Sequence, residues 1–399
     1  MKRPTGRLVA AIAMDERRVD VQCLPAEILE RVFHLLRPRC RKVVVQVCRW
    51  WREVGEAPVL WTWVTLTVRT SNLATMVRVL NTRRMGGVRR VQVRAVSEEL
   101  LQAITSHSSL RVINMANMDM VRLVDLSATE QKMKQSCLTC PHVTTLLTAL
   151  VKTPMLQKLN LSRHNLSSVG TGVLLALFVN MLEEVDLTST SLTTPQLTSI
   201  FMSILDRMKL RKLNLSYNKL SSVKAGLLAA AVGQLVEVDL PSTKLTPYQL
   251  TALFSSVEVS GRLKRLNISE NNLSSMEPVQ LASAASKLEE FEVEGACLTH
   301  THVEAIFVLR GFSKLRRISM DNNNLSLVNP TTIARGVNKL ERVSMECAFL
   351  TGEQINAILG LSLEGTCLRQ LTTWGLREEG EVDQELLLAA RRVIQHIDL

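Results

Sequence analysis

One phrase recurs along this chain and limits its fold more strictly than any other feature of the sequence. The pattern Leu-x-x-Leu-x-Leu, or a close aliphatic variant, starts at residues 156, 182, 210, 235, 263, 288, 315, 340, 368 and 394. Successive starts lie 25 to 28 residues apart and short and long intervals alternate, so the true period is a pair of units close to 53 residues long. Such a period predicts a solenoid, in which each unit contacts only its neighbours.

Each unit reads as a strand, a turn and a helix. The strand carries two inward aliphatic side chains, such as Leu159 and Leu161, and we expect them to join those of neighbouring units in one column. Aromatic residues make up only 4% of the chain while hydrophobic residues reach 46%, so Leu, Val and Ala must build this interior. Capping residues mark the expected helix starts at Thr194-Pro195, Ser221-Ser222, Thr246-Pro247 and Ser274-Ser275.

These units resemble the leucine-rich repeat, with lengths near those of the ribonuclease-inhibitor-like class. The resemblance implies an α/β horseshoe with a parallel sheet inside and helices outside. In that family an Asn amide bonds to the backbone of the turn. At this position the odd units carry His164, Asn218, Asn271 and Asn323, and the even units carry Thr190, Thr243, Ala296 and Ala348. Half of the Asn ladder is therefore absent, which predicts two alternating turn geometries.

Weaker units extend the array towards the N-terminus. Loose matches start at Trp61, Val88 and Leu110, whereas residues 116–136 break the period and are expected to form a loop with an irregular unit. We therefore expect an irregular solenoid over 61–155 and a regular one over 156–399. The sequence ends in the strand-like phrase Ile394-x-x-Ile397-x-Leu399, which leaves a sheet edge open unless something covers it.

The strand residues that flank the inward aliphatics should face the concave surface. The residues just before the second aliphatic of each template form a row that alternates in charge until its last step: Lys158, Glu184, Lys212, Glu237, Arg265, Glu290, Arg317 and Arg342. Neighbouring strands lie about 4.8 Å apart, so this row should be neutralised and should bind polyanions poorly. The two adjacent cations at its end are expected to lie close to Asp321 and Glu346.

A second concave row is polar and mildly acidic: Asn160, Asp186, Asn214, Asp239, Asn267, Glu292, Ser319 and Ser344. It would suit a partner with hydrogen-bond donors or basic groups. From the two rows we select as candidate substrate-binding residues Asp239, Asn267, Glu292, Arg317, Ser319, Arg342 and Ser344. The alternative interpretation is a solvated polar face without a ligand.

A helical block precedes the repeats. Apolar residues from Ile28 to Leu36 recur at three- and four-residue spacing, with Pro25 in the first turn and Pro38 at the end. A second helix is expected over residues 43–54, with Val44, Val47, Cys48 and Trp51 on its apolar side. Trp50 and Trp51 must point in different directions, so an exposed Trp would serve as an interface anchor. From these patterns alone, the block could equally be a cap on the solenoid.

The block resembles the F-box, the adaptor-binding module of SCF-type ubiquitin ligases. The family pattern falls on Leu24, Pro25, Glu27, Ile28, Leu29, Phe33, Val47, Cys48 and Trp51. By resemblance, the adaptor contacts are Leu24, Pro25, Ile28, Leu29, Phe33, Val47, Cys48 and Trp51. Cys40-Arg41 stands where the family usually has Asp-Leu, which removes a helix cap and leaves open both the start of the second helix and the affinity for the adaptor. We assign residues 21–60 to this module and 1–20 to a disordered basic tail.

The charge distribution also points to the N-terminal region. Residues 1–100 hold 19 Lys and Arg against 9 Asp and Glu, a net +10 of the total +11. This is either a solvated basic face or a surface steered to an acidic partner, and by resemblance the SCF adaptor is acidic. No zinc finger, helix-turn-helix or aromatic-stacking motif supports nucleic-acid binding. No segment approaches the 18 or so apolar residues of a membrane span.

Other sequence features concern the compartment. A signal peptide is not expected, and a mitochondrial presequence is a weak alternative. The eight cysteines are scattered, as in a reducing compartment, and Cys137-x-x-Cys140 is interpreted as an ordinary repeat position. Glycans on the Asn-x-Ser sequons at Asn160, Asn214 and Asn267 would block the concave sheet. We therefore expect a cytoplasmic or nuclear protein.

We find no catalytic pattern, cofactor motif or metal motif, and we expect His300 and His302 to be surface residues. The resemblance implies a non-catalytic substrate-recognition subunit of an SCF-type E3 ubiquitin ligase. The F-box would bind the adaptor and through it the cullin, and the repeats would hold an unidentified protein substrate. The first alternative is a non-ligase repeat scaffold. A more remote one is a GTPase activator, which would need an exposed catalytic Arg at a repeat turn that the sequence does not single out.

Overall fold

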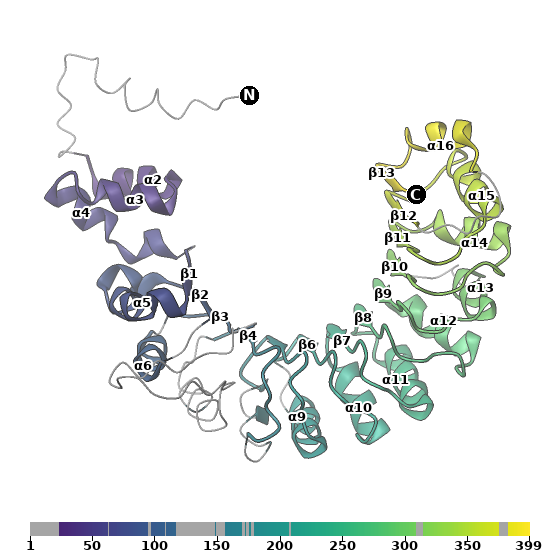
Figure 1. The fold of residues 1–399 in the computed structure, drawn as a ribbon, viewed down its shortest axis with the longest axis horizontal. Coiled ribbons are helices and arrows are strands. Elements are labelled where there is room, and N and C mark those ends of the chain that lie inside the picture. The colour runs from purple at the N-terminus through teal and green to yellow at the C-terminus, as the bar shows by residue number, and fades with distance from the viewer. Residues whose placement is uncertain are drawn as a thin grey trace.

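The structure is a horseshoe whose inner face is a single parallel sheet and whose outer face is a row of helices (Figure 1). It is a computed structural model that describes residues 24–62, 64–94, 97–107, 109–116, 148, 156–169, 172, 175–176, 179–206, 209–308, 314–374 and 382–399. The expected tail over 1–20, the expected irregular loop over 116–136 beyond Ala116, and Cys137 and Cys140 lie outside these residues. The predicted fold class, a leucine-rich-repeat solenoid preceded by a helical module, is confirmed.

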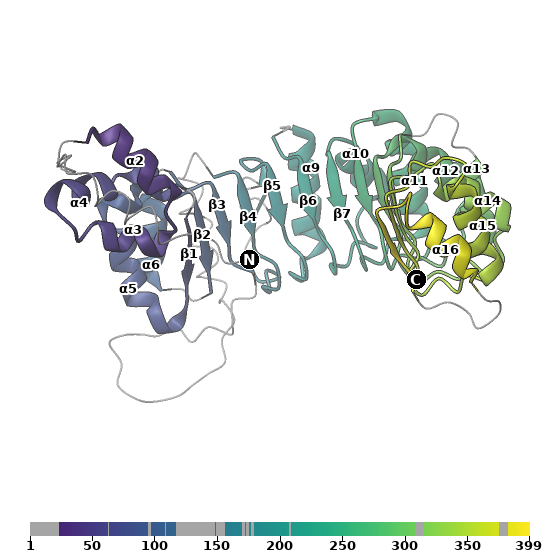
Figure 2. The same cartoon turned by 90° about the horizontal axis from the view of Figure 1, so that it is seen from above.

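The sheet has 13 strands, all parallel and in chain order. They are β1 Thr65–Val68, β2 Arg90–Val93, β3 Val112–Asn114, β4 Lys158–Asn160, β5 Glu184–Asp186, β6 Lys212–Asn214, β7 Glu237–Asp239, β8 Arg265–Asn267, β9 Glu290–Glu292, β10 Arg317–Ser319, β11 Arg342–Ser344, β12 Gln370–Thr372 and β13 His396–Asp398. Seen from above, this row of strands runs from the helical module to the C-terminal repeats (Figure 2).

The described helices cover the outer side of the sheet or form the N-terminal module. They are α2 Ala26–Leu35, α3 Pro38–Val44, α4 Arg49–Gly55, α5 Leu73–Leu80, α6 Glu98–Ser106, α9 Thr194–Asp206, α10 Ala225–Gly233, α11 Pro247–Ser260, α12 Pro278–Lys287, α13 His300–Val308, α14 Pro330–Val337, α15 Gly352–Ser362 and α16 Gln384–Ala390. Short 3₁₀ helices lie at Pro58–Trp61, Thr70–Asn72 and Arg83–Gly87.

The repeat template sets the phase of the strands. In β4 the central Leu159 is buried and its two neighbours are partly exposed, and it aligns with Val185 of β5. The same burial pattern holds in each strand from β3 to β10. Because the central side chain of each of these strands meets the equivalent side chain of the next, the inward apolar residues join one core, which also includes helix residues and extends from Leu29 of α2 to Ile394.

The first unit departs from the predicted phase. Leu66 aligns with Val91, so this unit starts two residues later than the template at Trp61 indicates. Trp61 is not in a strand but in the 3₁₀ helix Pro58–Trp61, and its indole donates a hydrogen bond to the Gly55 carbonyl at 3.0 Å. It is buried with Leu60 in the core that the helical module shares with the first repeat. The prediction of a strand beginning at Trp61 was wrong, because this side chain completes the helical module.

The expected alternation of turn geometries is confirmed. Odd units carry one residue with positive φ after the strand, as at Tyr217 and Glu270, whereas even units carry two, as at Ser242 and Lys244. In the odd-unit turns the buried Asn bridges two units. Asn271 donates to the carbonyls of Leu240 and Ile268 and accepts the N–H of Leu245. The Asn side chain thus ties the even turn before it to its own turn.

His164 takes the Asn position in the first regular unit. It is buried, and its Nε2 lies 2.9 Å from the carbonyl oxygen of Met115 in the preceding unit. Burial lowers the pKa of His164, although the hydrogen bond to Met115 acts in the opposite direction. The residue therefore bridges two units as a neutral ring.

A second buried ladder compensates for the missing Asn in even units. Gln249, near the start of α11, donates from Nε2 to the carbonyls of Leu220 at 2.8 Å and Val223 at 2.7 Å. Its Oε1 accepts the N–H of Thr246, which completes a capping box. Equivalent bridges from other even-unit helices come from Gln196, His302 and Gln354. These four residues recur at the period of the paired repeat, and this recurrence in the sequence could have revealed the ladder.

Two sequence expectations are corrected by this ladder. His302 is not a surface residue: it is buried, and its ring lies between Thr299 and the Met276 carbonyl. The serine pairs of the odd units do not start helices either. Helix α10 begins at Ala225, well after Ser221, because the turn must first bury Leu220 and present its carbonyl to Gln249. By contrast, Thr246 caps α11 as predicted.

We predict that Gln249→Ala lowers the free energy of unfolding by about 2–3 kcal/mol, because two buried carbonyls lose their donor. Urea denaturation measures this. The matched control is Gln280→Ala, since Gln280 makes its hydrogen bonds at an exposed site and should change stability by less than about 0.5 kcal/mol. Equal losses in the two variants would contradict the role assigned to the buried ladder.

Candidate functional site

The helical module contains three helices rather than two. The helix expected over residues 43–54 is interrupted: α3 ends at Val44 and α4 begins at Arg49. Cys48 lies between them in an extended conformation, and its sulfur accepts the backbone N–H of Trp51 at 3.4 Å. The prediction that Cys48 lies on a helix face was wrong, because its spacing to Val44 and Trp51 fits a helix that the structure interrupts. It is instead the cap that starts α4.

The residues predicted to contact an adaptor divide into buried and accessible groups. Leu29 and Phe33 are 2% and 1% exposed, so they hold the module together and cannot touch a partner in this conformation. Their assignment as contact residues is corrected, because their side of α2 faces the core. Pro25, Ile28 and Val47 are exposed, and Leu24, Cys48 and Trp51 are half-buried. Further exposed aliphatics that the motif did not indicate are Val32, Leu35, Val43 and Val59.

Neither tryptophan of the adjacent pair is fully exposed. The Trp50 indole donates to the Leu24 carbonyl at 3.2 Å, and the Trp51 ring packs edge-on against Phe33 with centroids 5.3 Å apart. The two rings do point in different directions, but both are half-buried against the module. Neither Trp50 nor Trp51 is therefore the free anchor that was expected, and the exposed apolar side chains of α2, α3 and the following turn are aliphatic.

Arg41, half of the Cys40-Arg41 departure, is a buried structural residue. Its Nε lies 2.9 Å from the carbonyl oxygen of Phe33 and 3.0 Å from that of Leu36, and Nη2 lies 2.8 Å from that of His34. Nη1 donates to the Leu60 carbonyl. One guanidinium thus satisfies the C-terminal end of α2 and joins it to the first 3₁₀ helix. Helix α3 starts at Pro38 without an acidic cap, so the departure does not prevent the helix from forming.

The concave row of alternating charges forms the predicted ion pairs. Lys158 and Glu184 approach to 2.6 Å, Lys212 and Glu237 to 2.8 Å, and Arg317 and Glu290 to 2.6 Å. Each pair joins neighbouring strands in register. Because these side chains are partly exposed, each pair stabilises the fold by only about 0–1 kcal/mol.

Arg265 is the centre of the most crowded part of this surface. Its guanidinium lies 2.8 Å from Asp239, 2.9 Å from Glu292 and 3.5 Å from Glu290. The contact with Asp239 falls outside hydrogen-bond geometry, so it is a charge contact. Burial raises the pKa of Asp239, and the attraction of Arg265 offsets this only in part. Glu292 also accepts from Asn267 at 2.5 Å. These predicted substrate residues are therefore engaged with one another.

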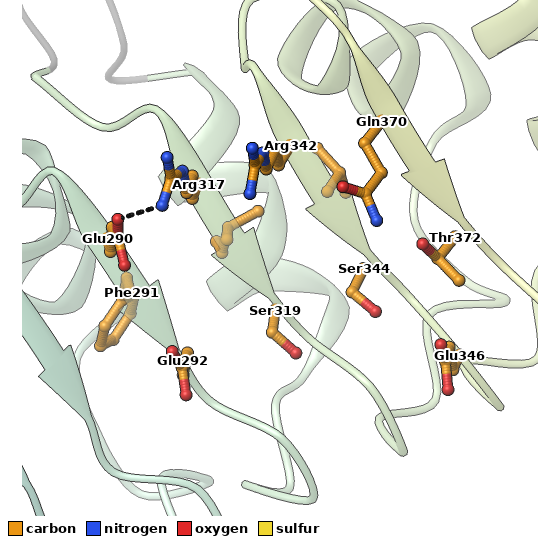
Figure 3. A pocket seen from close by; sticks show the side chains of 12 residues that line it. Glu290, Phe291, Glu292, Arg317, Ser319, Arg342, Ser344, Glu346, Gln370 and Thr372 are labelled. Carbon is orange, nitrogen blue, oxygen red and sulfur yellow. Dashed lines mark hydrogen bonds and ion pairs between the residues drawn. The ribbon is translucent and has the colours of Figure 1, made fainter. Parts of the chain in front are cut away.

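The row changes character at its C-terminal end. Arg317 and Arg342 lie side by side in register, as predicted (Figure 3). Asp321 does not pair with them. Its carboxylate accepts the hydroxyls of Ser319 at 2.9 Å and Ser344 at 2.7 Å. Within the described part of the chain, the Arg342 side chain has no ion pair, although it is exposed.

Among the residues that the structure describes, no group of three or more His, Cys, Asp or Glu side chains could hold a metal ion. None of the described helices is both long enough and apolar enough to cross a membrane.

Two family models match parts of the chain. Residues 21–67 match the F-box-like family, and residues 209–230 match the Leucine Rich Repeat family. No curated protein matches the chain. Among solved structures, the leucine-rich-repeat protein LegL7 of Legionella pneumophila is 15% identical, with a TM-score of 0.41 over 64% of this chain and 95% of that one. A leucine-rich-repeat protein of Leptospira interrogans is also 15% identical, with a TM-score of 0.44 over 84% of this chain and 88% of that one.

The chain therefore combines an F-box-like module with a leucine-rich-repeat solenoid, two modules that typically bind other proteins. Apart from the buried Leu29 and Phe33, the individual contact residues on either surface stay predictions.

We predict that Arg41→Ala lowers the free energy of unfolding of the helical module by about 2–4 kcal/mol, because several carbonyls lose a charged donor. Limited proteolysis would measure this loss as faster cleavage between residues 24 and 66. Arg39→Ala is the control, since Arg39 lies exposed on the same helix. Unchanged protease resistance of Arg41→Ala would contradict the role of this guanidinium.

We predict that Asp239→Asn raises the free energy of unfolding at pH 7 by less than about 1 kcal/mol, since Arg265 keeps two other carboxylates. The folded carboxyl binds its proton more readily than the unfolded one, so its charge costs stability above the folded pKa. This cost disappears as the pH falls through that pKa.

Urea denaturation at pH 7 and at about pH 4 measures the effect, and the difference between variant and wild type should shrink at the lower pH. Glu237→Gln on the same strand is the control. Its ion pair with Lys212 makes a small loss of stability the expected result. A loss in Asp239→Asn as well would show that the carboxylate is net stabilising.

Proposed function

We propose that this protein is the substrate-recognition subunit of an SCF-type ubiquitin ligase. The observation that supports this most directly is the F-box-like match over residues 21–67 together with exposed aliphatic side chains on the same module. Ile28, Val32, Val43 and Val47 are each more than 40% exposed, and an apolar surface of this kind suits a docking partner. The adaptor would bind here and link the chain to the cullin.

The rest of the structure is consistent with a receptor that holds its substrate at a set distance from the ligase. The core of the helical module continues into the first repeats through Leu60, Trp61 and Met85. Arg84 lies over the Trp61 ring at 5.5 Å, which adds a contact across the junction. A substrate on the concave sheet would therefore have a fixed orientation. Holding its lysine near a charged carrier enzyme on a partner subunit raises the effective concentration of the reacting groups.

In this proposal the chain itself is non-catalytic and needs no cofactor. It is located in the cytoplasm or the nucleus. Asn160 and Asn267 donate hydrogen bonds to Asp186 and Glu292 on the concave sheet. Glycosylation of these amides would remove those contacts, which favours a compartment without N-glycosylation.

The alternative function is a leucine-rich-repeat interaction protein whose helical module only closes the N-terminal end. Leu29, Phe33 and Trp61 favour this alternative in part, since all three are buried in the core shared with the solenoid. It does not account for the exposed Ile28 and Val47, because a cap needs no apolar outer surface.

We predict that the purified chain binds the SCF adaptor subunit and that Val47→Glu weakens this binding at least tenfold, because a charge would be buried at an apolar contact. Calorimetry measures the affinity. The Leu24→Ala/Pro25→Ala double variant and Trp51→Ala should also weaken binding. Val279→Glu is the matched control, because Val279 is similarly exposed on the outer helix α12.

Circular dichroism must show that each variant is folded. A folded wild-type chain that does not bind the adaptor would overturn the ligase proposal in favour of the interaction protein. Binding that Val279→Glu weakens as much as Val47→Glu would place the contact elsewhere.

A further inference from the structure

The C-terminal part of the concave face is hollowed. A depression of about 420 Å³ lies across β9 to β12, lined at its ends and floor by Glu290, Arg317, Arg342, Ser344, Glu346 and Gln370 among others (Figure 3). A second one of about 690 Å³ continues over β12 and β13 and shares Glu346, Gln370 and Thr372 with it. We call the first depression the β9–β12 hollow.

One end of the β9–β12 hollow carries a cation without a counter-charge. In the concave row the neighbouring Arg317 is paired with Glu290 at 2.6 Å, and the neighbour of Arg342 on the other side is the neutral Gln370. The alternation along the row would place a carboxylate where Arg342 stands. No acidic side chain of the described residues pairs with it, so its guanidinium is free to bind a carboxylate from another molecule.

The opposite end carries an anion without a counter-charge. Glu346 follows β11 four residues after Arg342, which corresponds to about 13 Å along an extended chain. Its backbone N–H donates to Asp321 at 2.7 Å, but none of the ion pairs among the described residues involves its carboxylate. Glu346 is half-exposed, so it can receive a cation.

An exposed aromatic residue holds, in the next unit, the repeat position that Glu346 holds in its own unit. Trp374 follows β12 and is 50% exposed, and its carbonyl accepts the N–H of Cys347 at 2.8 Å. The equivalent position of earlier units holds small or acidic residues, such as Ser216 and Glu294. A Trp next to a carboxylate is a favourable environment for a Lys or Arg side chain.

The floor between the two ends is shallow and polar. The residues that face outwards there are Ser319, Ser344 and Thr372, whose short side chains leave room for an extended backbone. The hydroxyls of Ser319 and Ser344 already donate to Asp321, so these side chains line the hollow with their hydroxyl donors in use.

We propose that the β9–β12 hollow binds an extended protein segment that carries an acidic side chain and, about four residues away, a basic one. The acidic side chain would meet Arg342 and Gln370, and the basic side chain would meet Glu346 and Trp374. This inference rests on the proposed role of the repeats in holding a protein substrate. Charge complementarity favours a carboxylate over a phosphate, because Glu290, Glu292 and Glu346 also line the hollow and repel a dianion.

The test uses the full chain and fluorescein-labelled ten-residue peptides of Gly, Ser and Ala that carry Glu and Lys four positions apart. Fluorescence anisotropy at low salt measures their affinity. We expect the Glu/Lys peptide to bind at least tenfold more tightly than peptides with two Glu, two Lys or a phosphoserine in place of the Glu. Arg342→Glu should weaken binding of the Glu/Lys peptide at least tenfold and should strengthen binding of the two-Lys peptide.

The matched control is Arg335→Glu, which changes the net charge equally but lies exposed on the outer helix α14. Equal losses in the two variants, preference for the phosphoserine peptide, or absence of binding by every peptide would each overturn the proposal. The peptide assay contains no adaptor. Peptide binding by a chain that fails to bind the adaptor would therefore support the hollow and reject only the ligase role.

Discussion

Parallel register between neighbouring strands is the constraint on which the rest of the structure depends. Each strand is only three or four residues long, and from β3 to β12 its central apolar side chain is buried and aligns with the equivalent residue of the next strand. A slip of one residue would turn that side chain out and bring its polar neighbours into the core. Register therefore fixes the positions of all flanking residues, and the concave rows of charged and polar side chains follow from it.

Strand pairing alone does not satisfy the backbone hydrogen-bonding groups of the long turns between strand and helix. Buried polar side chains supply the missing partners. Asn271 serves the odd-unit turn and Gln249 serves the even-unit helix, each by reaching backbone groups of the unit before it. Buried carbonyls without donors would cost free energy. The paired period of about 53 residues therefore has a structural cause: one Asn and one Gln or His link two consecutive units, so neither ladder can be complete in every unit.

The two candidate interaction surfaces differ in how many of their residues are already engaged in contacts within the fold. In the helical module some motif residues build the core and others stay accessible. Phe33 and Leu29 are buried, whereas Ile28 and Val47 are exposed. On the concave sheet most charges neutralise one another across strands, and unpaired charges remain where this pairing stops. Arg342 and Glu346 mark such a place at the C-terminal end of the row.

Local sequence patterns were enough to predict the solenoid, its phase from the second unit onwards, the alternating ion pairs and the F-box-like module. These features come from periodic local patterns that burial enforces residue by residue. The patterns did not indicate that Arg41 bonds to four carbonyls, that Gln249 and His302 bridge units, that Asp321 binds hydroxyls rather than Arg317, or that Trp61 belongs to the helical module. Each of these groups bonds to an atom that folding brings within reach, in the same segment for Trp61 and in another unit for Gln249, and residue spacing does not specify which carbonyl or hydroxyl that is.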